Sequence, residues 1–220
     1  FRSFHLTAQE ARRRGRKFNV LFVDWEVQFQ HTIDHIQAMK TLYEDCTEHF
    51  YWVALPITTV NGTSSYQPEW IAWEPGVKWI RQPPKDAITD PGYFPFYTPD
   101  MTFEDFVPSL NDWLARTPPV TPTAILTGMR ADESLMRFQS ICDRRKARYS
   151  PDKPWTTASM SSGACTIAPL YDWKTADIWS WFARTGAQCN PLYQLMFQAG
   201  VKPRYMRICE PFGPEQRTGL

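Results

Sequence analysis

The sequence predicts an α/β protein built on a parallel sheet with helices on both faces. Two continuous apolar runs, Asn19–Asp24 and Phe50–Leu55, are typical of strands that are buried on both sides. Between them, Thr32–Asp45 carries apolar residues at helical spacing, which is the pattern of an amphipathic helix. A strand, a helix and a second strand in this order favour a right-handed βαβ unit and therefore parallel pairing.

The remaining elements follow from local signals along the chain. Ala, Gln, Glu and Arg are good helix formers, and a glycine commonly ends a helix. An asparagine followed by a proline is a favourable helix start. We therefore expect helices at 6–15, 132–145, 174–185 and from Asn190 onward, a short strand at 124–130, and a loop at 159–168.

Residues 57–122 interrupt this α/β rhythm. Prolines recur through the segment and alternate with Trp, Tyr and Phe, a composition too aromatic for a disordered linker and too rich in proline for long regular elements. We expect a packed insertion with one short helix at 102–114, capped by Thr102. Its aromatic residues either form a satellite core or cover a substrate as a lid. The predicted organisation is 1–56 as the first part of the α/β domain, 57–122 as the insertion, and 123–220 as the rest of the domain with a C-terminal segment.

Composition excludes several classes of protein. The net charge is +1, so the chain as a whole has no field that attracts nucleic acid or a membrane, and we expect no direct contact with either. The basic run from Arg12 to Lys17 is interpreted as a solvated helix end. The five cysteines are scattered and include no C-x-x-C pair, which argues against a disulfide framework and a tetrathiolate metal site. The expected compartment is the cytoplasm.

Polar residues follow three predicted strands, where ligands of open parallel sheets bind. The candidates at these strand ends are Asp24 with Glu26, the segment Gly128–Ser134 with Arg137, and the pair Asp172 and Trp173. Gly128 allows close approach to the backbone, and the guanidinium of Arg130 matches phosphate or sulfate. The alternative is that Arg130 forms a structural ion pair with Asp132, Glu133 or Asp24.

Two further candidates involve a metal and a thiol. His31 and His35 are four residues apart on one predicted helix, but no third ligand is in register with them, so we expect no metal site. Cys209 is either a thiol nucleophile assisted by neighbouring arginines or a buried structural cysteine.

Four motifs in order resemble the phosphoadenosine-phosphosulfate reductase and sulfurtransferase family. They are Val20-Leu-Phe-Val-Asp24 with Phe29 and Thr32, Thr127-Gly-Met-Arg-Ala-Asp-Glu-Ser134 with Arg137, Pro169-Leu-Tyr-Asp-Trp173 with Asp177-Ile-Trp179, and Asn190-Pro-Leu-Tyr193. The aromatic insertion and Arg207-Ile-Cys-Glu-Pro-Phe-Gly213 are similar to the branch of the immunoglobulin-binding-regulator co-activator A.

This resemblance implies a Rossmann-like fold of the adenine-nucleotide α-hydrolase type. Its ligand would be an adenylated compound: phosphoadenosine phosphosulfate, adenosine phosphosulfate or ATP. The family's Ser-Gly-Gly-Lys-Asp-Ser phosphate loop is absent from the sequence, so we expect either a fragment or a loop-less form that is inactive alone. The implied ligand-binding residues are Asp24, Gly128, Arg130, Glu133, Ser134, Arg137, Asp172 and Trp173.

The resemblance leaves the reaction open. Reductases of the family use a cysteine in a Glu-Cys-Gly context, whereas Cys209 stands in Ile-Cys-Glu-Pro, and the cysteine pairs of an iron–sulfur cluster are missing. We expect no tightly bound cofactor. Three functions remain: a reductase or sulfurtransferase with Cys209 as nucleophile, a non-catalytic nucleotide-sensing co-activator with a regulatory protein partner, and adenylation or sulfur transfer in nucleic-acid modification.

Overall fold

The computed structural model describes residues 2–117, 123–143, 145–158, 164–206 and 208. The chain divides into two compact units. Unit 1 comprises Phe1–Gln9 and Pro108–Cys189, and unit 2 comprises Glu10–Val107 and Asn190–Leu220. Both units mix helices with short strands, which confirms the predicted α/β class.

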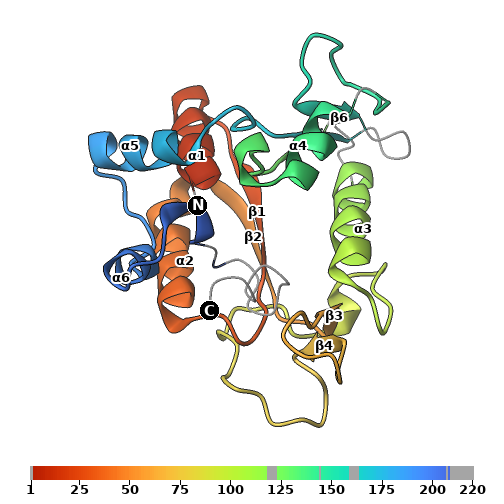
Figure 1. Ribbon diagram of the computed structural model, residues 1–220. Coiled ribbons are helices and arrows are strands. Elements are labelled where there is room, and N and C mark those ends of the chain that lie inside the picture. Colours follow the sequence, from red (N-terminus) through yellow and green to blue (C-terminus); the bar gives the residue numbers. More distant parts are fainter. Residues whose placement is uncertain (1, 118–122, 144, 159–163, 207, 209–220) are drawn as a thin grey trace. The chain divides into compact units, whose positions relative to one another are not determined.

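Unit 2 contains the predicted βαβ unit (Figure 1). Strand β1 (Phe18–Val23) pairs in parallel with β2 (Thr47–Val53), and α2 (Gln30–Leu42) and the short 3-10 helix η1 (Glu44–Cys46) connect them. The apolar face of α2 places Ile33 and Ile36 against Trp52, which is fully buried. The helical spacing therefore predicted the buried face of α2.

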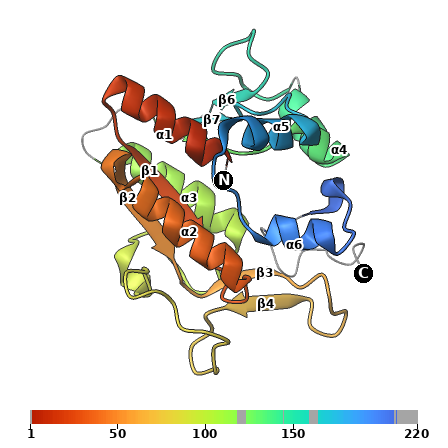
Figure 2. The same ribbon diagram turned by 90° about the vertical axis from the view of Figure 1, so that its left-hand side faces the viewer.

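The segment after β2 holds a hairpin that the sequence analysis did not predict. Strand β3 (Ile57–Val60) pairs antiparallel with β4 (Glu69–Ala72), and the pair lies side by side in Figure 2. The run Ile57-Thr-Thr-Val60 is rich in β-branched residues, which suit a strand. Proline recurrence around this run hid the signal.

The aromatic residues of the insertion pack mainly on one another. Phe94 is buried and directly follows the 3-10 helix η2 (Pro91–Tyr93). Its ring centroid lies 5.4 Å from that of Phe106, edge to face, and 6.3 Å from that of Tyr51 in β2. Phe96 is 5.3 Å from Phe94. These rings form an aromatic cluster, and the role of the insertion as a lid over a substrate stays a prediction.

Helix α3 (Phe103–Arg116) begins where the sequence predicted. The hydroxyl of Thr102 accepts the N–H of Asp105 at 3.2 Å, and the Asp105 carboxylate accepts the N–H of Thr102 at 3.2 Å. This reciprocal pair satisfies two N–H groups at the helix start.

Unit 2 also includes the C-terminal elements α6 (Leu192–Gln198) and the 3-10 helix η4 (Pro203–Tyr205). Asn190, which is fully buried, precedes α6 as predicted. Its side chain donates to the Thr32 hydroxyl at 3.0 Å and accepts the N–H of Leu192 at 2.9 Å, so it joins α6 to α2.

Unit 1 holds a three-stranded sheet in the order β5 (Ala124–Leu126), β7 (Cys165–Ile167), β6 (Thr156–Ala158). Strand β5 is parallel to β7, and β6 is antiparallel to it. Strand β7 lies within 159–168, which the sequence analysis assigned to a loop; three residues are too few to show a periodicity. Residues 159–163 of that stretch lie outside the described part of the chain.

The helices of unit 1 follow the predicted order, except that one predicted helix is divided into two elements. The helix expected at 132–145 is a 3-10 turn, η3 (Ala131–Glu133), followed by α4 (Leu135–Cys142), because Ser134 is extended and caps α4. Helix α5 (Thr175–Thr185) ends at Gly186, which has a φ of 62°.

Helix α1 (Arg2–Arg14) begins in unit 1 and ends in unit 2. Its basic last turn is exposed, as predicted for a solvated helix end, and Arg12 pairs with Asp45 at 2.7 Å. None of the described helices combines the length and the apolar character that a membrane span requires.

Candidate anion-binding site

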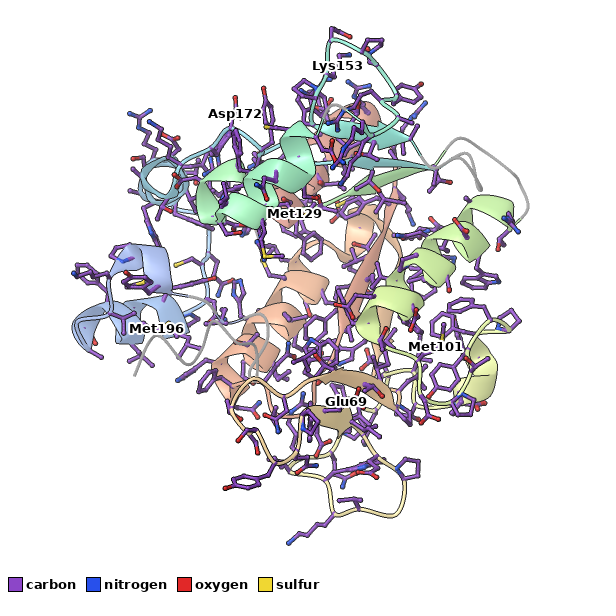
Figure 3. All side chains as sticks on the ribbon, turned by 45° about the vertical axis from the view of Figure 1, so that its right-hand side comes forward. Glu69, Met101, Met129, Lys153, Asp172 and Met196 are labelled. Atoms are coloured by element: carbon purple, nitrogen blue, oxygen red, sulfur yellow. The ribbon has the colours of Figure 1, made fainter. Side chains whose placement is uncertain are left out.

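The segment after β5 lies in unit 1 and holds most of the predicted site residues. Gly128 and Met129 lead into η3 and α4, as Figure 3 shows around the labelled Met129. Ser134 is the cap of α4: its hydroxyl accepts the N–H of Arg137 at 3.2 Å. The predicted role of Ser134 in ligand binding is not tested by this contact, which is a helix cap of the ordinary kind.

Arg130 is partly buried and forms ion pairs with two acidic neighbours. Its Nε lies 3.4 Å from the Glu133 carboxylate, and its Nη1 lies 3.7 Å from that of Asp132. Arg137 also pairs with Glu133. The structural ion pair that the sequence analysis weighed against anion binding is therefore formed, and Glu133 bridges two guanidinium groups.

Arg130 also reaches Trp173, so the second and third predicted strand ends meet. Its Nη1 donates to the Trp173 carbonyl at 3.1 Å. Asp132 accepts the N–H of Thr175 at 3.0 Å, which fastens η3 to the start of α5. Asp172 (labelled in Figure 3) is exposed beside Trp173.

The structure adds Arg2, which the sequence analysis did not select. Arg2 is 4% exposed, and its guanidinium lies over the ring of Trp173, with Cζ 3.3 Å from the centroid, and within 4.6 Å of the Trp181 ring centre. Its Nη1 donates to the Asp177 carbonyl at 3.1 Å. Its Nε and Nη2 are buried and have no hydrogen-bond partner among the described residues.

The environment of Arg2 disfavours its charge without removing it. Burial lowers the pKa of Arg2 to about 10; the charge of Asp177 opposes this fall, and the charge of Arg130 adds to it. Arg2 therefore stays protonated at neutral pH, with two N–H-bearing nitrogens aimed at no acceptor among the described residues. Such groups are costly when buried, and an anion would relieve the cost.

Ser3 and Gly128 bring the start of α1 next to the loop after β5. A Cβ on Gly128 would lie 3.3 Å from the Ser3 hydroxyl, which is a tight contact. That hydroxyl is buried and lacks a hydrogen-bond partner within the described part of the chain. The first N–H groups of a helix have no partner within the helix and favour an anion. No acidic residue stands in the first turn of α1.

Asp24 lies in unit 2, where its carboxylate has three hydrogen-bond donors. It accepts the indole N–H of Trp52 at 2.8 Å and the N–H of Glu26 at 3.0 Å, and it pairs with Arg81. Glu26, at a φ of 61°, accepts the N–H groups of Trp73 and Ile80, both at 2.8 Å.

Through these contacts, Asp24 and Glu26 hold the loop of residues 73–81 next to the end of β1. The role of Asp24 in ligand binding stays a prediction, and the described contacts are structural. Cys209, the predicted nucleophile, lies outside the described residues. The two histidines weighed as a metal pair differ in environment, since His31 is exposed and His35 is buried on α2.

The sequence did not predict Arg2 and Ser3 as site residues, because they precede the predicted helix at 6–15, for which no ligand-binding role was expected. The one available signal was an arginine and a serine in a first turn that has no acidic residue. Their partners, Trp173 and Gly128, are distant in sequence and become neighbours only in the folded unit.

Three comparisons with known proteins identify what this chain is similar to. A model of the phosphoadenosine phosphosulfate reductase domain matches residues 112–199, which include Gly128, Arg130 and Trp173. The uncharacterized protein YbdN of Escherichia coli (strain K12) is 57% identical over 216 residues, which are 98% of this chain and 52% of that protein. The chain therefore spans about half the length of this curated relative.

A solved structure was also matched. The crystal structure of phosphoadenylyl-sulfate reductase from Candida auris, in a phosphate complex, is 17% identical, with 81% of this chain and 66% of that chain covered and a TM-score of 0.36. The co-activator branch within the family stays a prediction. Residues 112–199 of this chain are similar to the phosphoadenosine phosphosulfate reductase domain.

Proposed function

We propose that this chain binds the anionic end of an adenylated substrate, of the phosphoadenosine phosphosulfate, adenosine phosphosulfate or ATP type, between Arg2 and Arg130. The observation that carries this proposal is the pair of buried nitrogens on Arg2 that lack an acceptor among the described residues. A sulfate or phosphate offers several acceptor oxygens and fits the planar fork of a guanidinium.

Trp173 has a positioning role in this proposal. One face of its ring is covered by the Arg2 guanidinium, and its carbonyl accepts from Arg130. Trp173 therefore positions both arginines. Its cation–π contact with the Arg2 guanidinium is desolvated and contributes about 1–2 kcal/mol to the stability of this arrangement. This use of the ring competes with stacking on an adenine base.

Glu133 is the internal competitor of the ligand. Its carboxylate bridges Arg130 and Arg137 in the described structure. A bound sulfate or phosphate takes the place of this carboxylate on Arg130, while the Ser3 hydroxyl and the first N–H groups of α1 supply further donors.

The test is a calorimetric titration of the chain with phosphoadenosine phosphosulfate and with ATP. We expect Arg2→Met to raise the Kd by roughly 10–100-fold, because charge-assisted hydrogen bonds contribute about 1.5–3 kcal/mol each. Arg184→Met is the matched control, since it removes the same charge from an exposed position on α5 of the same unit. Arg2→Lys, which keeps the charge and loses the fork, serves if Arg2→Met does not fold.

Equal Kd values for the Arg2 and Arg184 variants, or no binding of either nucleotide to the chain, contradict the proposal. Whether binding leads to chemistry is a separate question about Cys209. If Cys209 is the nucleophile, Cys209→Ala abolishes sulfite release from phosphoadenosine phosphosulfate, assayed with a dithiol as the two-electron reductant, and leaves the Kd unchanged. Binding without sulfite release from the unmodified chain favours the nucleotide-sensing role.

A further inference from the structure

A second feature of unit 1 is a partly open cavity of about 160 Å³ beside the β5–β7–β6 sheet. The apolar residues Met129, Ile141 and Trp155 line the cavity, together with the polar residues Ser140, Lys146 and Thr157. Arg2, Arg130 and Trp173 are not among the described residues that line this cavity. The cavity is therefore distinct from the place where Arg2 and Arg130 lie.

The size of the cavity decides what can fill it. Pockets for drug-sized ligands and cofactors measure about 300–1,000 Å³, whereas a cavity of about 150 Å³ holds a single benzene ring. At about 160 Å³, this cavity has room for one ring with a small substituent. It is too small for a complete adenylated nucleotide.

Trp155 gives the cavity an aromatic wall with a fixed orientation. Its ring stacks on Tyr171, with centroids 6.3 Å apart and planes 21° apart. Contacts between aromatic side chains stabilise a protein by about 0.5–1.5 kcal/mol in addition to the free energy gained from burying their area.

Lys146 brings a positive charge to the cavity. Its ammonium donates to the Ser140 hydroxyl at 3.1 Å, which uses one of its three N–H groups. Among the described residues, those that line the cavity include no carboxylate. The nearby Asp143 is bound by Arg145 at 3.1 Å, and hydrogen bonds from Arg145 lower the pKa of Asp143 to about 2, with a smaller contribution from the charge of Lys146.

Arg148 ties the walls of the cavity together. Its Nη2 donates to the carbonyls of Ile141 and Asp143 at 2.8 and 2.6 Å, at the end of α4. Its Nη1 donates to the carbonyl of Thr156 in β6 at 3.1 Å. The end of α4 and the start of β6 are thereby held at a fixed separation, so the cavity is formed before a ligand arrives.

We propose that this cavity is a second ligand site, which takes a small aromatic ring carrying a carboxylate. The ring packs on Trp155 and Met129, and the carboxylate pairs with Lys146. This site shares no lining residue with the nucleotide site proposed above, although Met129 stands between Gly128 and Arg130 in the chain.

The test uses benzoate as the probe and benzamide as its neutral match. The methionine methyl groups are labelled with carbon-13 and followed by NMR; Met129 lines the cavity, and Met196 of α6 lies in unit 2 and serves as the reference (Figure 3). We expect benzoate to shift the Met129 signal to saturation, with a Kd on the order of 1 mM for so few atoms, and to leave Met196 unchanged.

Two lysine variants isolate the ion pair. We expect Lys146→Gln to weaken benzoate binding by at least about fivefold and to leave benzamide binding unchanged. Lys153→Gln, at the exposed tip of the loop between α4 and β6 (Figure 3), is the control and leaves both unchanged. If Lys146→Gln does not fold, Trp155→Leu is used instead, and it weakens both probes.

The proposal is overturned if the Met129 signal does not saturate at about ten times the expected Kd, or if the lysine variants weaken benzoate equally. It is also overturned if benzamide binds as tightly as benzoate, because Lys146 then contributes no selectivity.

Discussion

Replacing Asp24 by Asn removes a negative charge from the least accessible ion pair of unit 2 among the described residues. The Asp24 side chain is 0% exposed and that of its partner, Arg81, is 16% exposed. The substitution keeps the shape of the side chain and an oxygen that can still accept the indole N–H of Trp52. What changes is that the Arg81 guanidinium loses its buried counter-charge.

The loss of stability follows from that unpaired charge. Breaking one partner of a buried pair costs about 3–5 kcal/mol, which is a large share of the roughly 5–15 kcal/mol that typically holds a domain together. At an m-value of about 2 kcal/mol/M in urea, a loss of about 4 kcal/mol lowers the midpoint of unfolding by about 2 M. The loop of residues 73–81, which carries Arg81, is the part of the unit that loosens first.

The assay is urea unfolding followed by near-ultraviolet circular dichroism, with hydrogen exchange of the Trp73 and Ile80 amides. Asp34→Asn is the matched control, because Asp34 is exposed on α2. Arg81→Met combined with Asp24→Asn removes the orphan charge as well. We expect the double variant to regain about 1–3 kcal/mol relative to the sum of the two single losses.

The competing reasoning makes Asp24 a ligand-binding residue. If Asp24→Asn loses less than about 1 kcal/mol of stability and weakens nucleotide binding about tenfold or more, the structural role of Asp24 is refuted. If the exchange rates of the Trp73 and Ile80 amides do not change, the role of this pair in holding the loop is wrong even where stability falls.

Three further predictions concern single positions. Burial lowers the pKa of His5, against the effect of its hydrogen bond with the Gln188 carbonyl, so the unfolded state binds more protons than the folded state below about pH 6.5. Stability therefore falls as the pH drops, and His5→Gln removes part of this slope in urea titrations at about pH 7 and pH 5; a slope that His5→Gln leaves unchanged contradicts this. Gly186→Ala costs about 1 kcal/mol because Gly186 has a φ of 62°, and Gly186→Asn costs less; equal thermal shifts for the two contradict this. Asn190→Ala leaves two buried groups unsatisfied and costs about 2–4 kcal/mol, and a midpoint of urea unfolding equal to that of the unmodified chain contradicts this.

The sequence by itself determined the elements whose signals are local. The continuous apolar runs and the helical spacing between them predicted β1, α2 and β2 and their parallel pairing. Glycine and asparagine marked the end of α5 and the start of α6, because these residues act through backbone geometry and capping within a few neighbours. Arg130 and Trp173 were predicted as site residues from their motifs, and the structure brings them into contact.

Only the tertiary structure decided which residues share a site. Arg2 and Asp177 are 175 positions apart, and nothing local in the sequence predicts that Arg2 stacks on Trp173 or keeps two nitrogens without an acceptor among the described residues. The same holds for β7, whose three residues form a strand because β5 and β6 lie on either side of it. Pairing partners and desolvation are set by chain segments that are remote in sequence, so neither can be predicted from a local pattern.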